Sequence, residues 1–272
     1  MATLRDGLEG YVEGIGLIGP GLGDWPQGAA VLTGTAPYAP QPTQYPSPQS
    51  LPPAERRRAS KLVKLTLSAG LEACTAAGLD PAHLASVFAS SGGDGENCHA
   101  ICEALAGEDR RISPTRFHNS VNNAAAGYWH IATGSMEPAT VICAYDGSFA
   151  AGLLETLAQV TQEGCAVLLV AYDCDYPQPL RRVRPIPDGL GVALVVTPRP
   201  GDHSLARIDL ALTEEPVTSL ADSRLEALRS AIPAARSLTL LETLARRDAA
   251  RPVLDYLGDL SLAVEVEPWP QP

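Results

Sequence analysis

Residues 141–155, VICAYDGSFAAGLLE, run from a short apolar strand through a turn into an amphipathic helix. Apolar residues recur at helical spacing after Gly147, whereas β-branched residues precede Cys143, as is typical of a strand. Cys143 stands one step before the turn, close to the mouth of the helix, and a helix N-terminus can activate a thiol. Two interpretations follow: Cys143 is a nucleophile, or it is a small apolar residue packed under a sheet.

Strands and helices alternate on both sides of this stretch. Downstream, CAVLLVAYD has the nearly continuous apolar character of a strand covered on both faces. Upstream, a helical pattern ends at Gly78, and LASVFASSGGDGE predicts a strand that enters a glycine loop. Further strands are expected near residues 11–18, 189–198, 203–213 and 259–267, and further helices near residues 97–107, 219–231 and 237–250. This order predicts a layered α/β fold with a largely parallel central sheet and a few antiparallel additions.

Composition limits the classes of partner. The chain has 272 residues, is 45% hydrophobic, and carries 31 acidic against 20 basic side chains, for a formal net charge of -11. It can therefore bury a substantial core, while its charge opposes attraction to nucleic acid or to an anionic membrane. No apolar stretch approaches the roughly 18 residues of a spanning helix, and the N-terminus has no signal pattern. We expect a cytoplasmic protein that binds neither nucleic acid nor membrane.

Six cysteines lack the spacing of a zinc site or a redox pair. Cys98 and Cys102 stand four apart beside His99, so one helical face can carry all three, but no second ligand pair follows. Packing of small residues is favoured over a metal, and neither a metal nor another cofactor is expected.

A basic run interrupts the acidic sequence. It consists of Arg56, Arg57, Arg58, Lys61 and Lys64. A run of this kind is either a solvated helix face or an anion-binding patch. The sequence favours the first interpretation and leaves the second open.

Two common motifs are absent. The glycine loop near residue 92 lacks the Gly-Lys-Ser/Thr ending that cradles phosphates and the spacing of a dinucleotide fingerprint. Ser148 directly follows Gly147, so the Gly-x-Ser-x-Gly elbow of hydrolases is missing as well.

Five stretches in order resemble the N-terminal half of β-ketoacyl synthases, which have the thiolase-like fold. They are GIGLIGPGLG, AGLEACTAAGLD, FASSGGDG, SPTRFHNSVNNAAAGYWHIATGS, and TVICAYDGSFAAGLLETL with AVLLVAYD. The sequences HNSVNNAAAGYW and DGSFAAGLLE resemble those of a divergent branch of the family that is found with aryl polyene and related polyketide gene sets. The resemblance implies half of a thiolase-like fold, with helices layered around a mostly parallel mixed five-stranded sheet and extra C-terminal strands and helices. We expect a single domain over residues 1–272, in which 1–200 form the family-like core and 201–272 pack on it as an extension.

The resemblance also sets the register of the elbow. In the family, the reactive cysteine precedes the glycine of the turn by three residues, which places Ala144, not Cys143, at the reactive position. Since one step along a strand turns a side chain to the opposite face, Cys143 is expected to point away from the elbow into packing. A shift of one residue would restore Cys143 as the nucleophile, although Asp146, expected near the helix N-terminus as a cap, would oppose a thiolate.

A second departure concerns the catalytic histidines. The resemblance to 3-oxoacyl-[acyl-carrier-protein] synthases implies two histidines and a lysine from a second half, for which residues 200–272 are too few. Decarboxylative condensation needs such donors to stabilise developing negative charge. Whether the chain is an enzyme stays open at this point.

Several polar residues are candidates for the lining of a remnant pocket. They are His118, Asn119, Asn122, Tyr145, Asp146 and Ser148. The asparagines equally suit a structural role, in which they cap and satisfy loop backbone. Tyr145, next to the elbow, would fill the space that an acyl chain otherwise uses.

Three functions are consistent with these observations. The first is a non-catalytic ketosynthase-like subunit, similar to chain-length factors, that pairs with a ketosynthase or with its own copy through ATVICAY and SFAAGLL. The second is an acyl-transferring condensing enzyme that uses Cys143 with a partner chain. The third is a module that binds acidic acyl carrier protein through the basic run.

Overall fold

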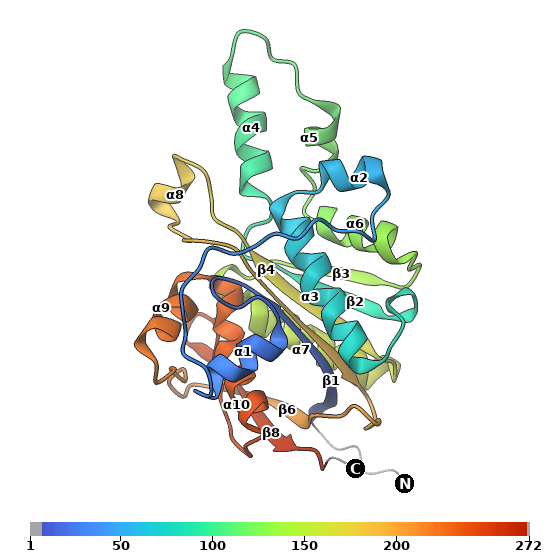
Figure 1. The fold of residues 1–272 in the computed structure, drawn as a ribbon, viewed down its shortest axis with the longest axis vertical. Coiled ribbons are helices and arrows are strands. Elements are labelled where there is room, and N and C mark those ends of the chain that lie inside the picture. The colour runs from blue at the N-terminus through green and yellow to red at the C-terminus, as the bar shows by residue number, and fades with distance from the viewer. Residues whose placement is uncertain (1–6, 271–272) are drawn as a thin grey trace.

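The computed structural model describes residues 7–270. They form one mixed eight-stranded sheet and the helices packed around it (Figure 1). The strand order is β3-β2-β4-β5-β1-β6-β8-β7. β2 pairs in parallel with both β3 and β4, and the remaining neighbours are antiparallel. The strands are β1 (Leu8–Ile18), β2 (Ala85–Ala89), β3 (Ala139–Ile142), β4 (Val167–Asp173), β5 (Leu190–Thr197), β6 (Ala206–Thr213), β7 (Val253–Leu257) and β8 (Leu260–Pro268).

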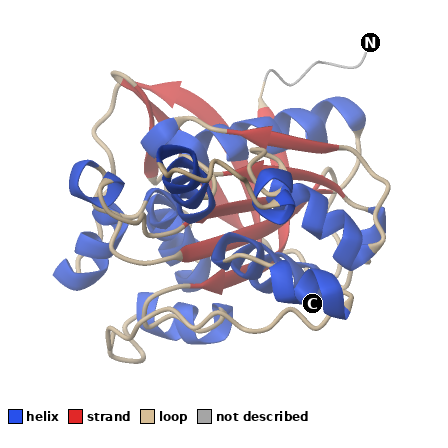
Figure 2. Ribbon diagram, turned by 90° about the horizontal axis from the view of Figure 1, so that it is seen from above, coloured by secondary structure: helices blue, strands red, loops and turns tan. Residues whose placement is uncertain are grey.

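Helices cover both faces of the sheet (Figure 2). α3 and α6 pack on one face, whereas α7, η3 and α10 pack on the other. The α-helices are α1 (Trp25–Leu32), α2 (Pro53–Arg58), α3 (Lys61–Ala77), α4 (Gly95–Ala106), α5 (Pro114–His118), α6 (Ala124–Thr133), α7 (Ser148–Glu163), α8 (Leu180–Val183), α9 (Ser223–Ala231) and α10 (Leu238–Arg246). Three short 3-10 helices are η1 (Pro81–His83), η2 (Tyr145–Gly147) and η3 (Pro233–Ser237).

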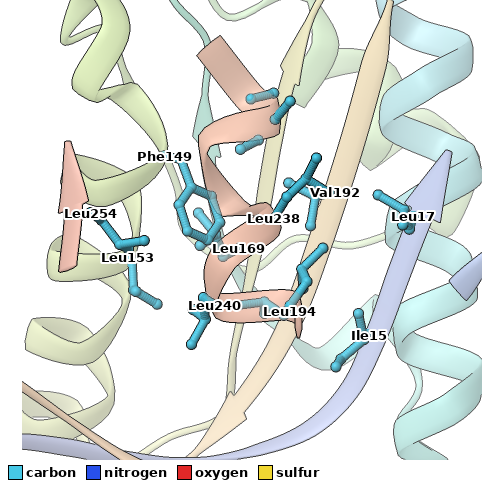
Figure 3. Close-up of a cluster of buried hydrophobic side chains, with 14 of the residues drawn as sticks. Ile15, Leu17, Phe149, Leu153, Leu169, Val192, Leu194, Leu238, Leu240 and Leu254 are labelled. Atoms are coloured by element: carbon cyan, nitrogen blue, oxygen red, sulfur yellow. The ribbon is translucent and has the colours of Figure 1, made fainter. Parts of the chain in front are cut away.

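Strand alternation divides the core into two clusters. Val192 and Leu194 of β5 point toward Phe149, Leu153 and the C-terminal helices, as Figure 3 shows. Their neighbours along the strand, Ala193 among them, face the cluster of α3 and α6 instead. Because each central strand buries both of its faces, its sequence is almost entirely apolar.

Two glycines of β1 determine how closely α3 approaches the sheet. A Cβ atom at Gly16 would collide with the carbonyl oxygen of Ala69, and one at Gly14 would collide with that of Ala73. Both collisions involve helix backbone, which cannot rotate away as a side chain can. Glycine is therefore required here for close packing of strand and helix.

The sheet differs from expectation in strand number and pairing. The five strands from β3 to β1 form a continuous block, but β6, β8 and β7 extend the same sheet to eight strands. The parallel arrangement is confined to β3, β2 and β4, since the chain returns through antiparallel β5 and then adds strands beside β1. β7 had no expected counterpart, because its five residues lack a clear alternation.

The predicted helix that ends at Gly78 is two helices. α2 ends at Arg58, and Ser60 begins α3 as its N-cap, with its hydroxyl accepting from the Val63 amide. Gly78 ends α3 in the left-handed conformation, as expected. Within residues 7–270, no helix combines the length and apolarity needed to cross a membrane.

Replacing Gly16 by Ala tests the close approach. The Gly16→Ala variant should lose about 1–3 kcal/mol of unfolding free energy in urea titrations, because the new methyl overpacks against helix backbone. Gly127→Ala is the matched control, since no atom lies within 4 Å of a Cβ at this exposed position in α6. It should gain about 0.5–1 kcal/mol. Equal effects of the two substitutions would contradict the packing argument.

Candidate functional site

The turn between β3 and α7, here called the elbow (residues 143–148), is closed by one serine. The hydroxyl of Ser148 accepts from the Ala144 amide at 3.0 Å and donates to the Tyr145 carbonyl at 2.7 Å. Tyr145 has a φ of 51°, a conformation uncommon for a residue with a side chain. Gly147 lies against the carbonyl oxygen of Tyr256 in β7, where no side chain would fit. The elbow is therefore a tight turn held by its own polar groups.

Cys143 is exposed, so the prediction that it packs under the sheet is wrong. β3 is an edge strand that ends at Ile142, so Cys143 lies beyond the last paired residue and no helix layer covers it. Its thiol donates to the amide oxygen of Asn122 at 3.5 Å. Within residues 7–270, no histidine or lysine hydrogen-bonds to this sulfur.

Ala144 lines a cavity at the elbow, and Cys143 is not part of that lining. The cavity has a volume of about 340 Å³ and lies between the elbow and the hairpin of β7 and β8. Tyr145 and Asp146 line it from the elbow side, and Arg236 and Asp255 line it from the C-terminal segments. The residue that faces this cavity from the end of β3 therefore carries a methyl group.

A network of alternating charges surrounds the elbow. Asp146 lies 2.6 Å from Arg184 and 3.0 Å from Arg236. Arg236 also pairs with Asp255, and Asp255 lies 2.9 Å from Arg229. Asp146 does not cap α7, contrary to the prediction, because its carboxylate is held by these arginines instead.

The arginines at both ends of the network are strongly paired. Burial alone would lower the pKa of Arg184, but its hydrogen bond and charge interaction with Asp146 outweigh burial and raise this pKa. The Arg184 guanidinium also lies 3.7 Å from the centre of the Tyr145 ring. At the other end, the hydrogen bond from Arg229 lowers the pKa of Glu226 to about 2. The ion pairs of the network thus hold the elbow between the end of α8 and the C-terminal strands.

Asp173, at the end of β4, connects the glycine loop to η3. Its carboxylate accepts from the Ser91 amide and hydroxyl at 2.9 and 2.6 Å, and from the Ala234 amide at 2.9 Å. Burial raises the pKa of Asp173 to about 6, because hydrogen bonds from Ser91 and Ala234 compensate only part of the desolvation.

The residues expected around a remnant pocket are only partly brought together. Asn122 reaches Cys143, whereas buried Asn119 accepts from the Tyr128 hydroxyl at 3.3 Å. His118 lies exposed at the end of α5, and nothing in the described chain hydrogen-bonds its ring to the elbow. Tyr145 is 63% exposed, so it lies at the surface of the isolated chain.

The basic run separates into different roles. Arg56 donates to the side chain of Gln49 and to the carbonyl of Leu51, which ties down the proline-rich loop. Arg57 is exposed on α2. The remaining members, Arg58, Lys61 and Lys64, line a second cavity of about 440 Å³ together with Arg116 of α5.

The structure also identifies residues that the sequence did not single out. They are Asp173, Arg184, Asp255, Arg236 and Arg116. Only Asp173 had a local signal, as a carboxylate directly after an apolar strand; the others act through partners that are distant in the sequence. Among residues 7–270, no three His, Cys, Asp or Glu side chains are placed to hold a metal ion.

Known structures share this architecture across nearly the whole chain. One is the complex of the ketosynthase ApeO with its chain length factor ApeC from Xenorhabdus doucetiae: the TM-score is 0.71 at 22% identity, covering 94% of this chain and 98% of that chain. Another is the ishigamide ketosynthase/chain length factor, with a TM-score of 0.70 at 15% identity and coverage of 94% and 98%. A third is AntDE:AntF, a type II polyketide synthase acyl-carrier protein in complex with its ketosynthase, with a TM-score of 0.73 at 10% identity and coverage of 95% and 98%. The fold is thus that of ketosynthase-type proteins.

The family match agrees with the fold. Residues 29–253 match the family described as β-ketoacyl synthase, N-terminal domain, and the chain belongs to it. No curated protein sequence matches the chain.

The buried carboxyl of Asp173 predicts a pH dependence of stability. The unfolded carboxyl titrates near its ordinary value of 3.8 and the native one near 6. Between these values the native state holds the extra proton, so raising the pH from 4 to 6 should lower the free energy of unfolding by up to about 1.4 kcal/mol per pH unit. Below both values this contribution is fully present.

Urea unfolding of wild type and Asp173→Asn at several pH values measures this contribution. The variant should be less stable overall, since an amide cannot accept every hydrogen bond that the carboxylate does, but its slope between pH 4 and 6 should lack the Asp173 component. Asp202→Asn, at an exposed position, should keep the wild-type slope. Identical slopes for wild type and Asp173→Asn would contradict the assignment.

Proposed function

We propose that the chain is a non-catalytic ketosynthase-like subunit, comparable to a chain length factor, that pairs with an active ketosynthase in polyketide or fatty acid assembly. The observation that carries this proposal is the methyl group of Ala144 at the elbow cavity, since the resemblance in sequence aligns Ala144 with the reactive cysteine of the family. The amide of Ala144 is occupied by the Ser148 hydroxyl as well, so it is not available to stabilise an oxyanion.

The similar structures support the pairing. Two of them are described as a ketosynthase with a chain length factor, and the match covers 98% of the aligned chain in each. The finer proposal of an aryl polyene type of pathway rests on the resemblance of residues 118–129 and 146–155 alone.

The edge strand β3 is the proposed pairing surface. β3 has β2 on one side and no strand on the other within the described chain, so its outer backbone groups can accept a further strand. Exposed apolar side chains lie on the segments next to it, with Met136 just before the strand and Ile131 on α6. Val141 of β3 packs against the core cluster that contains buried Trp129 of α6, so the strand and the helix share one core beneath these exposed residues.

Co-purification of the tagged chain with a co-expressed ketosynthase tests the pairing. Met136→Lys combined with Ala139→Lys should reduce recovery of the partner at least about tenfold, because charge is placed on an apolar contact. Leu257→Lys, an exposed apolar position on β7 at the opposite edge of the sheet, is the matched control and should bind as wild type. If the chain pairs with its own copy instead, light scattering should show a dimer for wild type and for Leu257→Lys, and a monomer for the β3 variant. If the β3 variant binds fully, or if the wild-type chain neither recovers a ketosynthase nor self-associates, the pairing proposal fails.

The exposure of Cys143 favours one alternative, an acyl-transferring enzyme that uses this thiol with a partner chain. Cys143→Ala discriminates between the two. Under the subunit proposal, product formation by the complex should stay within about twofold of wild type, and mass spectrometry after incubation with acyl thioester should find no acyl group on Cys143. Loss of product together with an acylated Cys143 in wild type would establish the enzyme instead.

A further inference from the structure

We propose that Cys98 and Cys102 of α4 form a two-coordinate site for a soft monovalent metal ion, copper(I). Both side chains line a cavity of about 480 Å³ between α4 and α8. Both are exposed, so the packing role predicted from the sequence is wrong for this pair. The inference does not depend on pairing with a ketosynthase.

The spacing of the two cysteines places both thiols on one face of the helix. Residues four apart in an α-helix are neighbours, with Cβ atoms about 5–6 Å apart. Cys102 acts on Cys98 through charge and a side-chain hydrogen bond, so the two sulfur atoms lie next to each other. Two metal–thiolate bonds of about 2.3 Å span about 4.6 Å, so one ion fits between these sulfur atoms without a change in the helix.

The same spacing disfavours a disulfide between the two residues. A disulfide needs Cβ atoms about 3.5–4.5 Å apart, which is shorter than the separation of such neighbours on an intact helix. The thiols of Cys98 and Cys102 therefore stay available to a metal ion while α4 is folded.

The ligand set identifies the class of metal. Thiolates are soft ligands that suit copper(I), and copper(I) accepts two ligands in a line. Structural zinc needs four ligands, whereas residues 7–270 place no three His, Cys, Asp or Glu side chains around one ion. His99 lines the cavity as well, but its Nε2 atom lies 3.3 Å from the Glu103 carboxylate. A two-coordinate ion is therefore the kind that this pair can satisfy.

The cavity also supplies a counter-charge for the loaded site. Binding breaks two S–H bonds, forms two S–Cu bonds and releases two protons to solvent, which leaves one net negative charge on the complex. Arg182 lines the cavity and makes no ion pair with any residue that the structure describes. Pro179, Leu180 and Val183 form the apolar part of the lining, and such a shell limits the access of water to a metal site.

A bound ion joins two turns of a weakly packed helix. Among the 12 residues of α4, only Asn97 is buried, and its side chain donates to the Arg116 carbonyl of α5 at 2.9 Å. α4 and α5 project together beyond the sheet in Figure 1. Most helical stability in proteins comes from packing of an apolar face, which α4 lacks, so a metal bridge between Cys98 and Cys102 should slow the opening of this helix.

Anaerobic titration of the full chain with copper(I), in competition with a chromogenic copper(I) chelator, tests the site. Wild type should bind one ion tightly through this pair, and a parallel titration with zinc(II) should show no comparable site. Cys98→Ser and Cys102→Ser should each weaken copper(I) binding at least about hundredfold, because losing a ligand costs more than the about 10–100-fold typical of losing an outer-shell partner. Cys165→Ser is the matched control: it removes an exposed thiol elsewhere and should bind as wild type.

A shifted pair separates chelation from the mere presence of thiols. Cys102→Ala combined with Leu105→Cys keeps two thiols on one face of α4 but moves them about 10.5 Å apart along the helix axis, a distance that one ion cannot bridge. This variant should bind as weakly as Cys102→Ser, and only wild type and Cys165→Ser should show slower hydrogen exchange in α4 with copper(I). Full binding by the shifted pair, unchanged binding by Cys98→Ser, equally tight zinc(II), or no binding by wild type would overturn the inference. Thermal unfolding of each variant verifies folding, since all substituted positions are exposed.

Discussion

The position of Asp146 between Arg184 and Arg236 is the constraint on which the elbow depends. The carboxylate stands in η2, just before α7 and beside a tyrosine in the left-handed conformation, and its two counter-charges come from the residue that follows α8 and from η3. Removing one partner of such a partly buried pair leaves a charge that neither water nor protein compensates fully. The geometry of this turn is therefore coupled to residues 201–272, which supply Arg236 and Asp255.

The same C-terminal segment determines which edge of the sheet is open. β6, β8 and β7 add to the side of β1, while β3 at the other end keeps one unpaired backbone edge within the described chain. β3 is only four residues long, which limits how much edge it exposes.

The candidate site shows where sequence reasoning stopped. The spacing from Gly147 identified Ala144 as the residue of interest, and Ala144 does line the elbow cavity. The same reasoning predicted that Cys143 is buried, because it assumed that the strand continues through residue 143. β3 ends one residue earlier, at an edge without a covering layer, and the thiol is left exposed. Whether a side chain is buried depends on what packs over it, and strand alternation carries no information about that.

Local patterns in the sequence determined the elements and the family. Continuous apolar runs fixed the central strands, helical spacing with Gly78 fixed the end of α3, and the ordered motifs identified a ketosynthase-type fold. Tertiary structure alone decided the order of eight strands, the charge network through Asp146, and the meeting of Lys64 with Arg116 at one cavity. The physical reason is the range of the interactions. Periodicity and capping act within a few residues, whereas ion pairs and strand pairing can join segments that are about a hundred residues or more apart in the chain.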